Sequence, residues 1–153
     1  LLTQWFRAGA VVGGFVRFEV VQESGWADGE DDLYRRQIGG MTPYSVNLPG
    51  VPWAYFHAGD YVALQTSMRF WARRALEFGP VASGVSLRDP DRRGETAFGT
   101  LLGVGGELDY RWGDWQANLR GGFSPSLRKM HPGMPGWTAL VSVGWAESPA
   151  TTK

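Results

Sequence analysis

Hydrophobic and polar residues alternate along much of this chain with a period of two, which is the pattern of β-strands that have one apolar face. Between positions 6 and 20 every even residue is apolar or glycine, whereas the odd positions carry Arg7, Arg17 and Glu19. The alternation therefore predicts one long strand over 6–20. The same pattern predicts strands at 60–70, 97–112, 115–124 and 137–145. A further strand is predicted at 76–87, where the alternation is less regular and we expect Pro80 to mark a bulge or a break.

The length of the strands and the order of their connections favour a membrane barrel. Several runs exceed the roughly 5–6 residues of an ordinary strand and match the roughly 9–11 residues with which a tilted strand crosses hydrocarbon. Short links near 72–75 and at 112–114 alternate with long links at 23–59, 88–96 and 124–136. All long loops would then lie at one end of the sheet, and aromatic residues mark the ends of the apolar faces, as in outer-membrane barrels.

Composition narrows the possible chemistry. The 153 residues include 22 glycines and no cysteine, so disulfides, thiolate metal sites and cysteine nucleophiles are excluded. The 15 basic and 15 acidic side chains cancel, which gives no reason to expect a nucleic-acid partner. No apolar run approaches the roughly 18 residues of a membrane-spanning helix. The mean hydropathy of -0.23 is compatible with strands that alternate between lipid and lumen.

The sequence thus predicts an all-β fold, an antiparallel transmembrane β-barrel of which about six spanning strands are seen. Residues 1–146 would form the barrel segment, with a long external loop at 23–59, and 147–153 would form a short periplasmic tail. Six strands cannot close a membrane barrel, for which about eight are the minimum. We therefore expect further strands from the same polypeptide or from another chain. The alternative is a soluble, lipid-binding β-barrel with its apolar face inward.

The alternation assigns side chains to two environments. The residues predicted to face lipid are Val62, Leu64, Leu102, Val104, Leu119, Val141 and Val143. Those predicted to face the lumen are Arg7, Arg17, Gln65, Arg69, Glu107, Asp109, Arg111 and Arg120. Because the second group has mixed signs, we interpret it as an internal lattice of salt bridges; the alternative is that it lines a pore and holds a plug.

The long loop at 23–59 divides into two parts. Residues 25–32 are polar and contain glycine, so we expect them outside the barrel. Residues 39–56 are too apolar to lie solvated, and their prolines lower the entropy lost when they become ordered. This second part is predicted to pack inward against the lumen wall, with Tyr44 and Trp53 as anchors, or to dock onto a partner protein.

The order of elements resembles the second part of the barrel in the BamA-type outer-membrane assembly factors, a family that includes bacterial surface antigens and two-partner secretion transporters. The similarity of motif covers Ile38-Gly39-Gly40-Met41-Thr42-Pro43-Tyr44, 59–64 and 68–70. The first segment resembles the Gly-Gly approach to the tip of the family's long inward loop, and the other two resemble the two ends of the next strand. Thr42-Pro43 stands where the family has its Arg-Gly tip, so the contact of that arginine is not carried over.

The resemblance implies a sixteen-stranded barrel in the outer membrane of a Gram-negative bacterium that inserts or translocates proteins without enzymatic chemistry. Gly39, Gly40 and Tyr44 would help to anchor its loop. The expected partners are outer-membrane lipid and lipopolysaccharide, additional barrel strands, and client or envelope proteins. A passive pore, or a structural barrel that anchors an envelope complex, is the alternative function.

We find no catalytic, cofactor or metal site in the sequence. His57 and His131 lie in predicted loops without ligand spacing, and the acidic run at 28–32 lacks the full spacing of a calcium loop. Ser83 is not flanked by the glycines of a nucleophile elbow. The protein is therefore expected to be neither an enzyme nor a cofactor carrier.

Overall fold

The computed structural model describes residues 2–26, 36–40, 46–52, 56–58, 60–73, 75–88, 99–130 and 132–145. One antiparallel sheet of seven strands has the order β1-β2-β5-β6-β7-β8-β9. Its strands are β1 (Leu2–Val12), β2 (Val16–Trp26), β5 (Asp60–Arg73), β6 (Leu76–Arg88), β7 (Gly99–Trp112), β8 (Trp115–Phe123) and β9 (Trp137–Trp145). The two short strands β3 (Arg36–Ile38) and β4 (Phe56–Ala58) pair with each other, and α1 (Pro125–Met130) is a six-residue helix. The expected all-β fold is confirmed.

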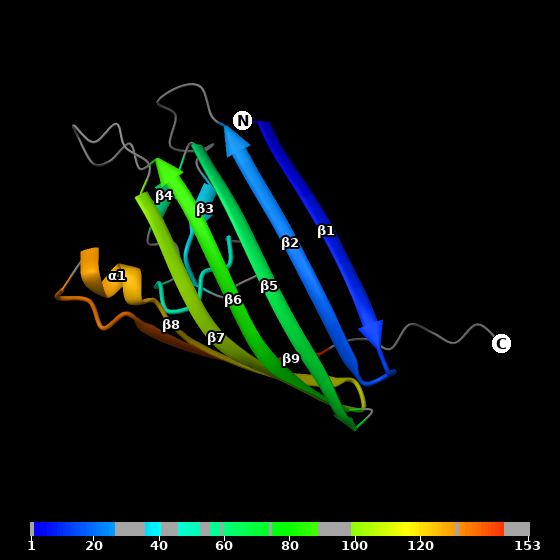
Figure 1. The fold of residues 1–153 in the computed structure, drawn as a ribbon. Helices are drawn as coiled ribbons and strands as arrows, with labels where there is room; N and C mark the ends of the chain where they lie inside the picture. The colour runs from blue at the N-terminus through cyan, green and yellow to red at the C-terminus, as the bar shows by residue number, and fades with distance from the viewer. Residues whose placement is uncertain are drawn as a thin grey trace.

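The main sheet is curved, and β3, β4 and α1 lie on its inner side (Figure 1). We call the face of Ala63, Val85 and Leu101 the inner face, and the opposite face, which includes Leu64 and Leu102, the outer face. The sheet is open, because β1 and β9 each pair with only one neighbour in the described part of the chain. No described helix has the length and apolarity that crossing a membrane would need.

The prediction of one strand over 6–20 was wrong. The segment forms two strands joined by a turn at 13–15, where Gly13 and Gly14 have φ angles of 62° and 74° that favour glycine. Because Val12 pairs with Val16, the even positions stay on the same face through the turn, and the alternation continues without a visible break. The main sheet consequently has seven strands, one more than the sequence predicted.

Connections alternate between short and long, as predicted. The chain passes from β1 to β2, from β5 to β6 and from β7 to β8 at one end of the sheet, which we call the turn end. It leaves β2, β6 and β8 at the other end, which we call the loop end. The first long connection begins later than expected because β2 continues to Trp26. Pro80 lies inside β6 opposite Gly106, and the pairing of β6 with β5 is interrupted at Gly79 and Pro80. The register shift lies elsewhere, between Trp71 and Arg73.

The last long connection contains helix α1, which the sequence analysis treated as loop. Pro125 occupies its first position, and the backbone N–H of Leu127 donates to the Ser124 hydroxyl over 3.2 Å. The Ser124 hydroxyl itself donates to the Leu102 carbonyl over 2.7 Å, which fixes the helix to β7. Leu127 is fully buried in the core.

The hydrophobic core lies between the inner face and the segments that cover it. Ile38, Val46, Leu48 and Val51 from the first long connection pack with inner-face residues such as Val85 and Leu101. The core is thus formed on the concave side of the sheet, and the large side chains of the outer face take no part in it.

Candidate functional site

The covering segment, defined as residues 36–40 and 46–52, holds itself together through its own backbone. Gly39 donates to the Val46 carbonyl over 3.2 Å, and Gly40 donates to the Val51 carbonyl over 2.8 Å. Leu48 donates back to the Gly40 carbonyl over 2.9 Å. Both glycines have positive φ angles, 117° and 80°, so the Gly-Gly pair is required by this tight crossing of the chain.

Leu48-Pro49-Gly50 is the point at which the covering segment meets the sheet. A Cβ atom placed on Gly103, Gly105 or Gly122 would collide with or crowd Pro49. Gly50 has a φ of 81°, and its N–H donates to the Thr138 hydroxyl on β9 over 3.1 Å. We call Gly103, Gly105, Gly122 and Thr138 the docking patch, because these residues let the segment approach the backbone of three strands.

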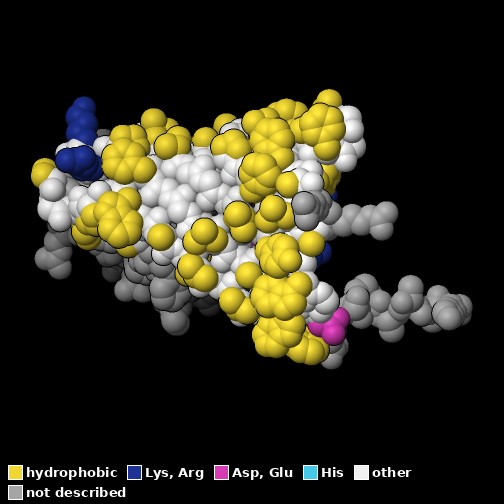
Figure 2. All heavy atoms as spheres, turned by 90° about the horizontal axis from the view of Figure 1, so that it is seen from below, with side chains coloured by type: hydrophobic (Ala, Val, Ile, Leu, Met, Phe, Trp, Pro, Cys, Tyr) yellow, Lys and Arg dark blue, Asp and Glu magenta, His cyan; other side chains and the backbone are white. Residues whose placement is uncertain are grey.

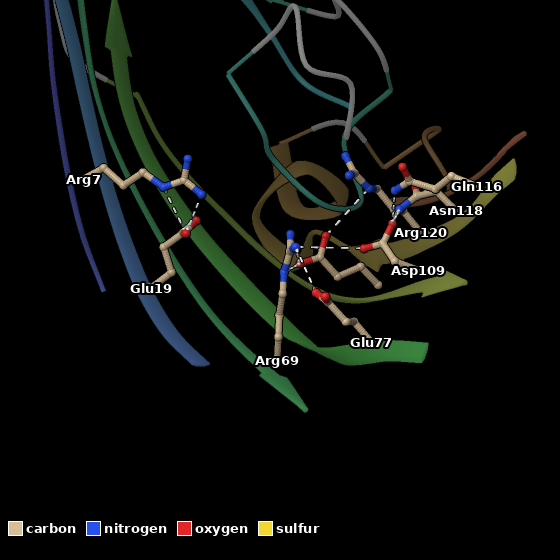
Figure 3. Close-up of polar contacts among 9 residues, drawn as sticks. Arg7, Glu19, Arg69, Glu77, Asp109, Gln116, Asn118 and Arg120 are labelled. Atoms are coloured by element: carbon tan, nitrogen blue, oxygen red, sulfur yellow. Dashed lines mark hydrogen bonds and ion pairs between the residues drawn. The ribbon is translucent and has the colours of Figure 1, made fainter. Parts of the chain in front are cut away.

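The rest of the inner face carries charge. Arg69 on β5 contacts Glu107 on β7 through both Nε and Nη2, each over 2.7 Å, and Nη1 lies 3.9 Å from Glu77 and 4.0 Å from Asp109. Arg120 on β8 places its Nε 3.7 Å from the second oxygen of Glu107. These five residues, the ion network, point toward one another from four neighbouring strands (Figure 3).

Two amides complete the ion network. Asn118 donates to Asp109 in a short hydrogen bond, and Gln116 donates to the same carboxylate oxygen over 3.4 Å. The Glu107 side chain is only 4% exposed, so it depends on Arg69 and Arg120 to offset its loss of water. The inner face therefore has an apolar half beneath the covering segment and a charged half toward the turn end.

The residues predicted to face the lumen all lie on the inner face. Beside the members of the ion network, Arg7 pairs with Glu19 over 2.6 Å, and Arg17 lies over the Trp71 ring with its Cζ 5.3 Å from the ring centre. Gln65 lies half-buried opposite Ser83, while Arg111 is exposed near the turn end. The structure brings Arg69, Glu107, Asp109 and Arg120 together, whereas Arg7 and Arg17 contact Glu19 and Trp71.

The residues predicted to face lipid all lie on the outer face. Val62, Leu64, Leu102, Val104, Leu119, Val141 and Val143 are 47–68% exposed. In the space-filling view, apolar side chains cover this face with very few charged groups among them (Figure 2). The outer face is thus apolar, exposed and convex.

Aromatic residues form two bands on the outer face. The band at the turn end contains Tyr110, Trp112, Trp115 and Trp145, whose rings lie in a chain of contacts 5.2–6.3 Å between centroids. The band at the loop end contains Trp26, Phe123 and Trp137. Trp115 and Phe123 are eight positions apart on β8, or about 26 Å along the strand at about 3.3 Å per residue.

Some predicted positions lie outside the described residues. This holds for Tyr44 and Trp53, the two expected aromatic anchors, and for His131. His57 belongs to β4, but its side chain is outside the description. Among the residues that are described, no group of three or more His, Asp or Glu side chains is placed to hold a metal ion.

The sequence analysis predicted that residues 39–56 pack inward, but it identified neither the docking patch nor Leu48-Pro49-Gly50 as the point of contact. One signal was available, since Gly103 and Gly105 are two apart and so share a face of β7. Comparisons with protein families, with curated proteins and with solved structures found no match to this chain.

Replacing Gly103 with valine should displace the covering segment, because the new side chain would collide with the Pro49 carbonyl. Chymotrypsin, which cuts after large apolar residues, should then cleave the 36–58 region faster than in the wild-type protein. Gly144→Val is the matched control, since a Cβ there meets no atom within 4 Å. Equal protection of the segment in Gly103→Val and wild type would contradict the docking geometry.

Glu107→Gln should destabilise the fold by about 1–3 kcal/mol, because it leaves Arg69 and Arg120 beside a neutral group. Glu19→Gln is the control, and it should cost less than about 1 kcal/mol because its partner Arg7 is 59% exposed. Urea unfolding followed by tryptophan fluorescence measures both. A smaller loss for Glu107→Gln than for Glu19→Gln would show that the ion network does not stabilise the sheet.

Proposed function

We propose that this chain is part of an outer-membrane β-barrel that helps to insert or translocate other proteins and performs no catalysis. The observation that carries the proposal is the distribution of side chains across the curved sheet. Large apolar residues cover the convex outer face, and charged residues gather on the concave inner face. A soluble sheet has the opposite distribution.

The outer face favours lipid as its environment. Val104 and Val141 are 54% and 68% exposed and belong to a contiguous apolar surface, whereas soluble monomers rarely expose apolar patches above a few hundred Å². The two aromatic bands are about 26 Å apart along the strand, or about 20 Å along the axis of a barrel with a typical strand tilt. Lipid tails would contact the apolar side chains between the two bands, and lipid headgroups would contact the aromatic side chains of the bands.

A soluble, lipid-carrying barrel is disfavoured by the inner face. Such a carrier needs an apolar cavity inside, but here the covering segment fills the apolar half and the ion network occupies the charged half. The space that would hold the ligand of a soluble carrier is therefore taken by protein.

The open sheet supports the presence of further strands. In lipid, each unpaired backbone group on β1 or β9 would cost several kcal/mol. We therefore propose that strands from the same polypeptide or from another chain complete the barrel. The same edges suit the insertion role, because an edge strand can pair with the strand of a client protein.

The resemblance to the assembly factors and the inward-packed covering segment favour insertion over a passive role. A passive pore or an envelope anchor is the second candidate, favoured by the ion network, whose fixed charges would line any open lumen. Lipopolysaccharide would contact the loop end in either case.

Spin labels on neighbouring residues test the environment of the two faces. Because the chain has no cysteine, Leu64→Cys and Gln65→Cys each give one labelling site. In vesicles, the label at 64 should be accessible to oxygen dissolved in lipid, and the label at 65 should be shielded from it. If the label at 64 instead responds to a water-soluble relaxation agent, the membrane barrel is excluded.

The insertion role predicts faster folding of other barrels. A urea-unfolded eight-stranded outer-membrane protein, diluted onto vesicles that contain this protein, should fold several-fold faster than onto empty vesicles. Vesicles with Gly103→Val protein are the control for the covering segment, and planar-bilayer conductance tests the alternative. Unchanged folding rates together with steady conductance would replace the insertion role with that of a passive pore.

A further inference from the structure

The register of the sheet produces a groove on the outer face. Pro80 pairs with Gly106, Gly106 with Gly121, and Gly121 with Ala139, so these four residues form one row across β6, β7, β8 and β9. All four have small or compact side chains. The groove has a volume of about 600 Å³ and includes the whole row in its lining.

Large side chains form a wall beside this row. Phe78 pairs with Leu108, and Leu108 pairs with Leu119, so the next row toward the turn end is bulky. These three residues also line the groove, and Phe70 extends the wall because its ring centre lies 5.8 Å from that of Phe78. On the other side, the next row contains Val104 and Phe123. On β7 and β8 the row of small residues therefore lies between two rows of larger apolar side chains, which we call ridges, and the turn-end ridge of Leu108 and Leu119 lines the groove itself.

The chemistry of the groove excludes a peptide as its occupant. Its floor belongs mainly to β6, β7 and β8, each of which has a neighbouring strand on both sides, and the pairing of β6 with β5 is interrupted at Gly79 and Pro80. Addition of a peptide strand needs a free sheet edge, which this surface lacks. Glu107 and Arg120 border the groove but direct their charged groups to each other in the ion network.

A hydrocarbon chain meets none of these objections, because it needs no hydrogen bond and gains dispersion contacts with the apolar side chains that line the groove. The groove is also continuous with the apolar outer face and lies on the turn-end side of Val104, next to the aromatic band of Tyr110 and Trp112. A headgroup at that band would place its acyl chain beside the trough. No described outward-facing cation borders the groove to select an anionic headgroup.

We propose that this groove holds one acyl chain of a zwitterionic phospholipid. The proposal rests on the proposed function, in that the outer face must lie in a bilayer. It goes further because it assigns a retained lipid to the groove. Lipids in contact with β1 and β2 are expected to exchange freely with the bilayer.

Two glycines of the row allow the groove to be filled. A Cβ on Gly106 would lie 3.6 Å from the Gly79 carbonyl oxygen, and a Cβ on Gly121 would lie 3.6 Å from the Thr138 carbonyl oxygen. Both are ordinary contact distances, and neither glycine has a positive φ angle. Gly106→Leu and Gly121→Leu should therefore fold and obstruct the groove. Ala139→Leu is an independent filling variant, and Ala8→Leu on the outer face of β1 is the matched control.

Photo-crosslinking tests the proposal. The protein is reconstituted in phosphatidylcholine vesicles in which one acyl chain carries a diazirine, and the adducts are mapped by mass spectrometry. Wild type and Ala8→Leu should carry at least about twofold more adducts on the groove strands β6–β9 than on β1 and β2, because contacts with the lining of the groove hold the chain in place. The filling variants should lose this excess. Circular dichroism identifies any variant that does not fold, and the remaining ones decide the result.

Two other outcomes would overturn the proposal and are distinguishable. Adducts spread evenly over the outer face in all proteins would overturn the groove and leave the membrane barrel in place. The absence of adducts from the entire outer face would overturn the membrane barrel and the groove together.

Discussion

The contact of Pro49 with the glycines of β7 and β8 is the constraint on which the inner face depends. Gly103, Gly105 and Gly122 bring the backbone of the sheet within reach of the covering segment, and any side chain there would hold the two apart. Once Pro49 is seated, Leu48 and Val51 become buried beside Leu101 and complete a core that the sheet alone cannot form. A single curved sheet has only one layer, so this segment supplies the second layer that a stable core needs.

The change from glycine to charge along β7 divides the inner face. Gly103 and Gly105 accept the covering segment, and two residues further toward the turn end Glu107 begins the ion network. Buried charges tolerate few arrangements, since each needs its partners at close range. The covering segment and the ion network thus use the same concave surface in two ways, one through close backbone contact and the other through paired charges. Both connect several strands and so oppose separation of the sheet.

Much of the fold follows from period-two alternation, because side chains on a strand must point to opposite faces. This suffices to place Leu64 outside and Arg69 inside, and to predict the alternation of short and long connections. It could not reveal the hairpin at 13–15, since the turn there conserves the phase of the pattern. Nor could it pair Arg69 with Glu107, because that contact depends on the register of β5, β6 and β7. A shift of one strand by two residues would leave the same side chains on each face, so the hydrophobic pattern does not fix the register. The docking of Pro49 depends on a close approach to the backbone of the sheet. The apolar character of the loop does not show where on the sheet this approach occurs.

The glycines on the two faces of the sheet have different physical explanations. On the inner face, a Cβ at Gly103 or Gly122 would overlap atoms of Pro49, so packing accounts for the absence of a side chain. On the outer face, Gly106 and Gly121 have room for a Cβ and ordinary φ angles, so neither the sheet nor the core accounts for them. Glycine weakens a strand because it restricts the backbone less and packs nothing. Two such residues paired on adjacent central strands carry a cost in stability, which the proposed acyl chain in the groove would offset.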